Sequence, residues 1–112
     1  MINGERQTKA AIRWAMVGGG KGSQIGYIHR SAAERDRYFQ MTAGAFDLDA
    51  ARGRAFGVEL GLDPDRCYGD YMAMFAAESA RPDGIRAVSI ATPNNTHYEI
   101  SKAALLAGIH VI

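Results

Sequence analysis

Short apolar runs alternate with longer segments of helical spacing along most of the chain. The apolar runs that predict strands cover residues 12–17, 39–46, 67–68, 87–91 and 109–112. Apolar residues at helical spacing predict helices over residues 25–35, 50–60, 71–79 and 96–107. Strand and helix therefore alternate from Ile12 onward.

This alternation predicts an α/β fold with a parallel sheet, because consecutive parallel strands need a crossover between them. The crossovers are right-handed, which gives a Rossmann-type doubly wound parallel sheet with strand order 3-2-1-4-5 and helices on both faces. In such a sheet, ligands bind beyond the carboxyl ends of strands one and four, where the strand order reverses. The loops that follow residues 17 and 91 are therefore the expected place for a site.

Helix ends and buried faces follow from residue type. Asp49 and Asp70 are expected to cap the helices that follow them, and Thr96 with Glu99 has the spacing of a capping box. Arg30 is expected to face solvent. The residues expected to face the sheet are Ile25, Ile28, Ala32, Ala51, Ala55, Phe56, Val58, Met74, Phe75, Ile100, Ala103, Ala104 and Ala107.

A glycine-rich stretch, residues 18–26, joins the first strand to the first helix. This order leaves unpaired backbone N–H groups at a helix start, where an anion is favoured. Glycines also leave room for a phosphate to touch the main chain. The stretch does not match a strict G-x-G-x-x-G pattern, because residue 23 is Ser, and it does not match a P-loop, because Lys21 is followed by Gly22. A purely structural turn is therefore kept as the alternative interpretation. The candidate phosphate contacts are Gly18, Gly20, Gly22, Ser23 and Ile25.

Asp47 stands at the end of the second predicted strand. An acidic residue there can accept hydrogen bonds from the ribose hydroxyls of adenosine, and it repels a 2′-phosphate. An equally good interpretation is a carboxylate that complements the dipole of the next helix. For a dinucleotide bound at the glycine loop, Asp47 slightly favours NAD. Arg52 and Arg54 lie close in sequence and can offset the repulsion of a 2′-phosphate, so NADP is kept as the alternative cofactor.

A turn of sequence Thr-Pro-Asn-Asn-Thr-His follows the fourth predicted strand, from Thr92 to His97. It stands at the opposite lip of the expected crevice, where the nicotinamide half of a dinucleotide would lie. Thr92, Asn94 and His97 offer hydrogen-bonding groups there, and Pro93 fixes the turn. A structural or solvent-facing histidine is the competing interpretation of His97.

Composition narrows the function classes. The 112 residues allow one domain, expected over residues 12–112 after a loose arm at 1–11. A net charge of +1 gives no reason to expect nucleic acid or an anionic membrane as partner. The single cysteine, Cys67, excludes an internal disulfide and fits a reducing, cytoplasmic location. No stretch is apolar enough to cross a bilayer, and no histidine or cysteine has metal-ligand spacing.

Four segments together resemble the N-terminal domain of the Gfo/Idh/MocA oxidoreductases, the glucose–fructose oxidoreductase and inositol dehydrogenase family. They are the glycine loop through His29, the stretch from Asp47 to Phe56, residues 91–97 and residues 107–112. The most specific part is Thr-Pro-Asn-x-x-His, followed by Ala-Gly-Ile-His-Val. The glycine loop carries extra residues relative to the common family pattern.

The resemblance implies an NAD(P)-dependent dehydrogenase that acts on a sugar, an inositol or a related polyol, and that is often an oligomer. It implies pyrophosphate contacts at Gly18, Gly20 and Ile25 and a ribose contact at Asp47. It also implies that Thr92, Pro93, Asn94 and His97 border the nicotinamide. The family's Glu/Asp-Lys-Pro motif, whose lysine assists proton transfer, is expected just beyond Ile112, so no catalytic residue is expected within this chain. The chain is accordingly expected to be an inactive fragment that lacks a substrate domain.

Two other functions fit parts of the pattern. One is a stand-alone nucleotide-binding or sensing module without catalysis. The other is a methyltransferase, because a glycine loop after strand one and an acid after strand two also suit S-adenosylmethionine. The Thr-Pro-Asn turn and the helix after it argue against the methyltransferase.

Overall fold

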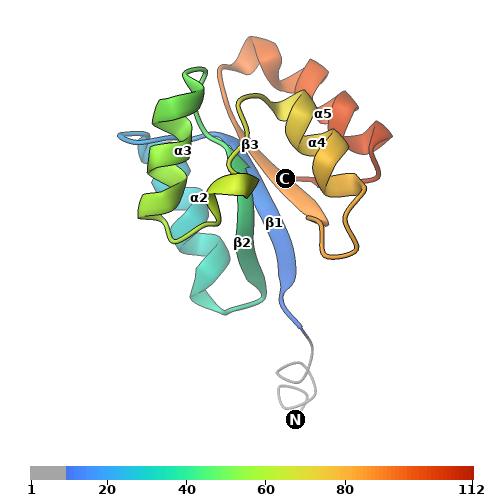
Figure 1. The fold of residues 1–112 in the computed structure, drawn as a ribbon, viewed down its shortest axis with the longest axis horizontal. Coiled ribbons are helices and arrows are strands. Elements are labelled where there is room, and N and C mark those ends of the chain that lie inside the picture. Colours follow the sequence, from blue (N-terminus) through green and yellow to red (C-terminus); the bar gives the residue numbers. More distant parts are fainter. Residues whose placement is uncertain (1–9) are drawn as a thin grey trace.

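The computed structural model describes residues 10–112, so nearly all of the loose arm expected at residues 1–11 lies outside the described residues. Strands and helices alternate in the order the sequence predicts (Figure 1). The strands are β1 (Ile12–Gly18), β2 (Phe39–Ala45), β3 (Ala87–Ala91) and β4 (His110–Val111). The α-helices are α2 (Gln24–Arg35), α3 (Ala50–Glu59), α4 (Tyr71–Ser79) and α5 (His97–Leu106). Two short 3₁₀ helices, η1 (Pro64–Arg66) and η2 (Asn94–Thr96), lie in the loops.

The four strands form one parallel sheet in the order β2-β1-β3-β4. The strand expected at residues 67–68 is reduced to a single parallel bridge between Cys67 and Gly44, on the outer side of β2. If that bridge is counted as the predicted third strand, β3 and β4 are the predicted fourth and fifth strands. The observed order then corresponds to the expected 3-2-1-4-5. The Rossmann-type α/β fold is confirmed, with its third strand almost lost.

Helices cover both faces of the sheet, and each face has its own core. Trp14, Met16 and Met41 pack with Phe56 of α3 on one face. On the other face, the apolar side chains of the sheet pack against α4 and α5. Figure 1 shows α2 and α3 on one side of the sheet and α4 and α5 on the other.

An irregularity in β2 changes which of its residues face each core. Trp14 pairs with Met41, but the next residue, Ala15, pairs with Ala43, so Thr42 is an extra residue in the ladder. Met41 therefore belongs to the core under α3, whereas Ala43 belongs to the core under α4 and α5. The simple alternation that predicted this strand does not reveal the change of face.

The faces expected for α2 and α3 are largely wrong. Ile25 and Ile28 are about half exposed, and Val58 is 52% exposed. The buried residues are instead glycines together with Phe56: Gly26 in α2, and Gly53 and Gly57 in α3. A Cβ on Gly57 would collide with the sulfur of Cys67, so these helices approach their neighbours too closely for the expected side chains. In α4 and α5 the expected inward residues Met74, Phe75, Ile100 and Ala104 are buried, as predicted.

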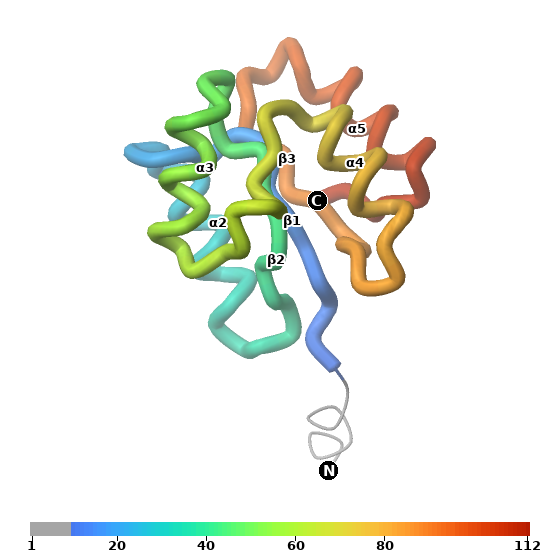
Figure 2. The backbone as a smooth tube through the Cα atoms, viewed as in Figure 1, coloured from blue at the N-terminus to red at the C-terminus, as the bar shows by residue number. Residues whose placement is uncertain are grey.

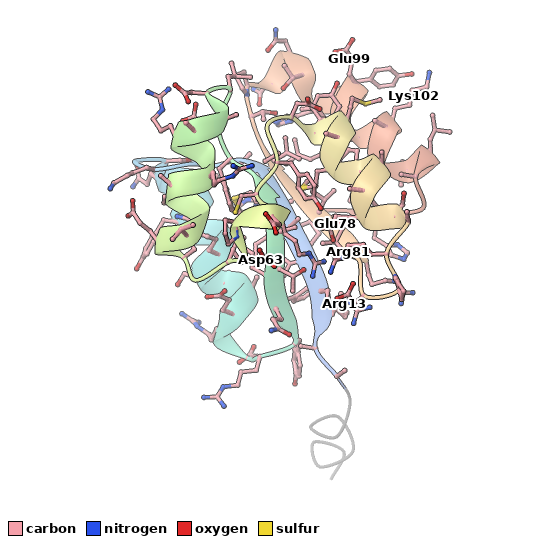
Figure 3. All side chains as sticks on the ribbon, viewed as in Figure 1. Arg13, Asp63, Glu78, Arg81, Glu99 and Lys102 are labelled. Atoms are coloured by element: carbon pink, nitrogen blue, oxygen red, sulfur yellow. The ribbon has the colours of Figure 1, made fainter. Side chains whose placement is uncertain are left out.

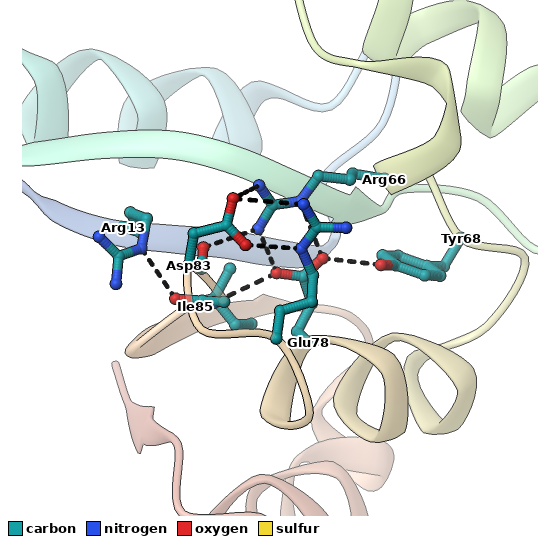
Figure 4. A network of polar contacts seen from close by, with 8 residues as sticks. Arg13, Arg66, Tyr68, Glu78, Asp83 and Ile85 are labelled. Carbon is teal, nitrogen blue, oxygen red and sulfur yellow. Dashed lines mark hydrogen bonds and ion pairs between the residues drawn. The ribbon is translucent and has the colours of Figure 1, made fainter.

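A buried ionic network anchors the loop between α4 and β3 (Figure 4). The carboxylate of Glu78, which is fully buried, accepts hydrogen bonds from Arg66, from the Tyr68 hydroxyl and from the backbone N–H of Ile85. Arg13, at the start of β1, donates to the backbone oxygen of Gly84 in the same loop. The network thus joins segments that lie far apart in the sequence.

Candidate functional site

The loops that follow β1, β2 and β3 gather at one end of the sheet, because the strands are parallel (Figure 2). A crevice of about 470 Å³ opens between these loops and the first turns of α4 and α5. Figure 3 shows Glu99, which lines this crevice, and Arg13, which belongs to the ionic network, toward opposite ends of the molecule. The crevice is lined by Val17, Gly18, Ala45, Phe46, Asp47, Leu48, Gly69, Asp70, Tyr71, Ala91, Thr92, Pro93, Thr96, Glu99 and Ile100.

The glycine loop has a backbone that only glycine accommodates easily. Gly18, Gly19 and Gly22 have φ angles of 76°, 65° and 86°. A Cβ on Gly18 would lie 2.6 Å from the carbonyl oxygen of Ala91, and a Cβ on Gly20 would lie 2.8 Å from the carbonyl oxygen of Phe46. Gly22 has open space around it. At Gly18 and Gly20 glycine is therefore required because the loop packs against the ends of β2 and β3, and Gly18 also lines the crevice.

The first turn of α2 is fixed by two local contacts. The Ser23 hydroxyl caps the helix by accepting from the backbone N–H of Gly26 at 3.1 Å. Gly26 also touches the loop, since a Cβ there would lie 2.5 Å from the Gly19 oxygen. Gly26 therefore brings the first turn of α2 into direct contact with the glycine loop. Ile25 is half exposed and does not line the crevice.

Asp47 lines the crevice and is held by Arg52. Arg52 Nε and Nη2 donate to the two carboxylate oxygens of Asp47 at 2.8 and 3.1 Å, and the backbone N–H of Asp49 donates to one of them at 2.9 Å. The hydrogen bond from Arg52 lowers the pKa of Asp47, so the carboxylate is charged at neutral pH. The cap of α3 is Asp49, which accepts from the backbone N–H of Arg52. Asp49 is therefore the cap of α3, as predicted.

The turn after β3 is closed by its own side chains. Thr92 Oγ1 and Thr96 Oγ1 lie 2.6 Å apart, and the Thr96 hydroxyl donates to the Pro93 oxygen at 2.7 Å. His97 Nε2 lies 2.8 Å from the backbone oxygen of Thr92, so its ring holds the turn that lines the crevice. The capping box expected at Thr96 is wrong: its side chain makes no cap hydrogen bond, because the residues before α5 form η2 and the hydroxyl turns back to Pro93.

The structure brings together part of the predicted set. Gly18, Asp47, Thr92 and Pro93 line the crevice from its two lips. The others lie beside it without lining it: Gly20, Gly22, Ser23, Ile25, Asn94 and His97. Sequence reasoning missed Leu48, Gly69, Asp70, Tyr71 and Glu99, which come from the loop after β2 and the starts of α4 and α5. Their proximity to the turn after β3 depends on the packing of α4 beside α5, for which the sequence carries no local signal.

Other kinds of site find no support within residues 10–112. No group of three or more His, Cys, Asp or Glu side chains in this part of the chain is arranged to hold a metal ion. Burial raises the pKa of the Cys67 thiol, which makes it a poor nucleophile. Among the described helices, none has the length and apolar character needed to cross a membrane.

The parallel sheet, the glycine loop and the crevice where the strand order reverses define a nucleotide-binding domain of the Rossmann type. Residues 12–112 match the family described as the oxidoreductase family with an NAD-binding Rossmann fold. The chain therefore belongs to the Gfo/Idh/MocA oxidoreductases, as the resemblance in its sequence implied.

Individual relatives are closely similar. The uncharacterized oxidoreductase YfiI of Bacillus subtilis is 65% identical over 113 residues, which cover 100% of this chain and 29% of that protein. An inositol dehydrogenase homolog from Azotobacter vinelandii, solved in complex with NADH and myo-inositol, superposes with a TM-score of 0.88 at 67% identity, over 90% of this chain and 27% of its own. An oxidoreductase from Pseudomonas syringae superposes with a TM-score of 0.89 at 67% identity, over 90% of this chain and 28% of its own. The chain thus spans less than a third of the length of these relatives.

Proposed function

We propose that this chain binds a nicotinamide dinucleotide in the crevice between the glycine loop and the Thr92 turn. In this proposal it is the cofactor domain of a dehydrogenase that acts on a sugar, an inositol or a related polyol. The observation that carries the proposal is that three segments distant in sequence, at Gly18, at Asp47 and at residues 92–93, line one crevice. The polyol class is supported by the Azotobacter vinelandii homolog, which was crystallised with NADH and myo-inositol.

Each part of the crevice has a proposed share in binding. The pyrophosphate would lie on the glycine loop, where the main chain is bare and the α2 N-terminus favours negative charge. This assigns it to Gly18, Gly20, Gly22, Ser23 and Ile25. Because the Ser23 hydroxyl already caps α2, the share of Ser23 would come from its backbone.

The Asp47 carboxylate would accept hydrogen bonds from the ribose hydroxyls of the adenosine half. Its negative charge disfavours a 2′-phosphate, so NAD is slightly favoured over NADP. Arg52, paired with Asp47, works against this preference by lowering the local negative potential.

The nicotinamide half would border Thr92, Pro93 and Asn94. His97 would act through the backbone of Thr92, which it holds at 2.8 Å. When bound, the nicotinamide ring supplies hydride exchange with a substrate carbon. Hydride transfer also needs a held substrate and a positioned base, which we assign to the part of the relatives' length that this chain does not span.

Isothermal titration calorimetry of the 112-residue chain tests the binding proposal. NAD, NADP and S-adenosylmethionine are titrated separately, and a dinucleotide is expected to bind. Binding of S-adenosylmethionine without either dinucleotide would refute the dehydrogenase assignment. The reading frame beyond Ile112 tests the enzyme assignment, since a Lys-Pro pair within a few codons is expected there.

We also propose a cytoplasmic location for the parent protein and an oligomeric parent. The buried, unpaired Cys67 supports a reducing compartment. Size-exclusion chromatography of the whole protein, with light scattering, tests the oligomer.

A further inference from the structure

We propose that Arg30 is a positioning residue for the phosphate-binding loop: from the far side of the loop it fixes the peptide unit between Gly19 and Gly20 and supplies a positive charge. The inference rests on the proposed dinucleotide function and goes beyond it, because Arg30 does not line the crevice. Sequence reasoning placed this side chain in solvent.

Three contacts hold the Arg30 guanidinium in place. Nη1 donates to the Gly19 oxygen at 2.8 Å and lies 3.9 Å from the sulfur of Met16. The guanidinium carbon lies 5.0 Å from the centre of the Phe56 ring, within the range of a cation–π interaction. The side chain therefore joins α2, the glycine loop and α3 at one point.

The hydrogen bond to Gly19 determines how the loop presents its next N–H group. No peptide bond in the described chain is cis. In a trans peptide unit the C=O and N–H groups point in opposite directions. Because the Gly19 oxygen faces Arg30 and Gly26, the N–H of Gly20 points away from them. We assign that N–H to the phosphate side of the loop.

The contact also places a cation behind a loop that is made of neutral residues and Lys21. Burial lowers the pKa of Arg30, and Glu34 opposes this effect, but a guanidinium remains protonated in proteins. Lys21 instead pairs with Glu59 at 3.1 Å on the exposed surface. Within residues 10–112, Arg30 is therefore the cation that directly contacts the loop backbone.

The test uses the 112-residue chain and the variant Arg30→Met, with Arg35→Met as the matched control. Arg35 lies on the same helix, is exposed and carries the same charge. Affinities for NADH, ADP-ribose and adenosine are measured by calorimetry or NMR titration, and Trp14 fluorescence in urea reports folding. ADP-ribose keeps the pyrophosphate without the nicotinamide, whereas adenosine has no phosphate.

We expect Arg30→Met to weaken NADH and ADP-ribose binding about tenfold, the size of a lost charge-assisted hydrogen bond, and to leave adenosine binding unchanged. Arg35→Met should leave all three affinities within about twofold. An equal loss for adenosine, or no loss at all, overturns the inference. If the wild-type chain binds no dinucleotide, the proposed function itself fails and takes the inference with it.

Arg30→Lys covers the case in which Arg30→Met does not fold. The lysine keeps the positive charge, but it has no planar guanidinium to lie over the Phe56 ring while donating to the Gly19 oxygen. A loss of about threefold confined to NADH and ADP-ribose supports the positioning role. A loss shared with adenosine refutes it.

Discussion

Replacing Glu78 by Gln should destabilise the fold strongly while leaving the crevice intact. All four acceptor positions of the buried carboxylate are used: two by Arg66, one by the Tyr68 hydroxyl and one by the N–H of Ile85. A Gln amide presents an NH₂ group to two of these donors in either orientation. In the better orientation the NH₂ group takes the place of Oε2, which faces Arg66 Nε and the Tyr68 hydroxyl. The Tyr68 hydroxyl can rotate to accept a hydrogen bond from the NH₂ group, so only the hydrogen bond from Arg66 Nε is lost. The arginine charge is then left without a balancing carboxylate charge at this position.

The expected cost is about 3 kcal/mol, the low end of what breaking a buried ion pair costs. The low end applies because Arg66 keeps contacts to Asp83, to its backbone oxygen at 3.2 Å and to its carboxylate at 3.7 Å. For a domain of this size, 3 kcal/mol corresponds to a decrease in Tm of about 12 °C. Urea unfolding followed by Trp14 fluorescence measures the loss, because Trp14 is fully buried.

The same variant should change the pH dependence of stability. Burial opposes ionisation of Glu78, but the hydrogen bonds from Arg66 and Tyr68 outweigh it and lower the pKa of the carboxyl. A folded-state pKa below the unfolded one stabilises the protein above the unfolded pKa, and this contribution disappears as pH falls through the folded pKa. Glu78→Gln should therefore flatten the acid limb of the stability curve.

The exposed Glu59, paired with Lys21, provides the control. Glu59→Gln should stay within about 0.5 kcal/mol of wild type. If Glu78→Gln costs less than about 1 kcal/mol, or no more than the control, the network does not carry the stability assigned to it.

Three further substitutions test the site. Gly18→Ala should destabilise by about 1–3 kcal/mol more than Gly22→Ala in urea unfolding, because both have positive φ but only Gly18 lacks room for a Cβ. Asp47→Ala should weaken NAD binding more than NADP binding, whereas Asp49→Ala should cost about 1 kcal/mol of stability as a lost cap without changing that preference; equal losses for both cofactors would remove the ribose role. His97→Ala should weaken NAD binding severalfold, and His97→Gln, which keeps a donor, should restore part of it; unchanged affinity in both would show that the turn holds without the ring.

The sequence by itself determined the order of strands and helices, most helix ends and both lips of the crevice. Asp49 and Asp70 cap helices as expected, since a side-chain oxygen beside a free backbone N–H is a local interaction. The loops after β1 and β3 could be placed at one end of the sheet, because parallel strands and right-handed crossovers leave no other arrangement. Family resemblance added the cofactor class, and the match over residues 12–112 confirmed it.

Only the tertiary structure decided which helix faces are buried and which groups surround the loop. Gly53 and Gly57 are buried where larger residues were expected, because the distance between α3 and its neighbours sets the side-chain size that fits. The extra residue at Thr42 arises from the pairing of β2 with β1, and the Arg30 side chain is held between Gly19 and the more distant Phe56. The pattern of apolar and polar residues in the sequence shows which side chains are hydrophobic. Only the packing of helices and strands against one another decides which groups each side chain contacts.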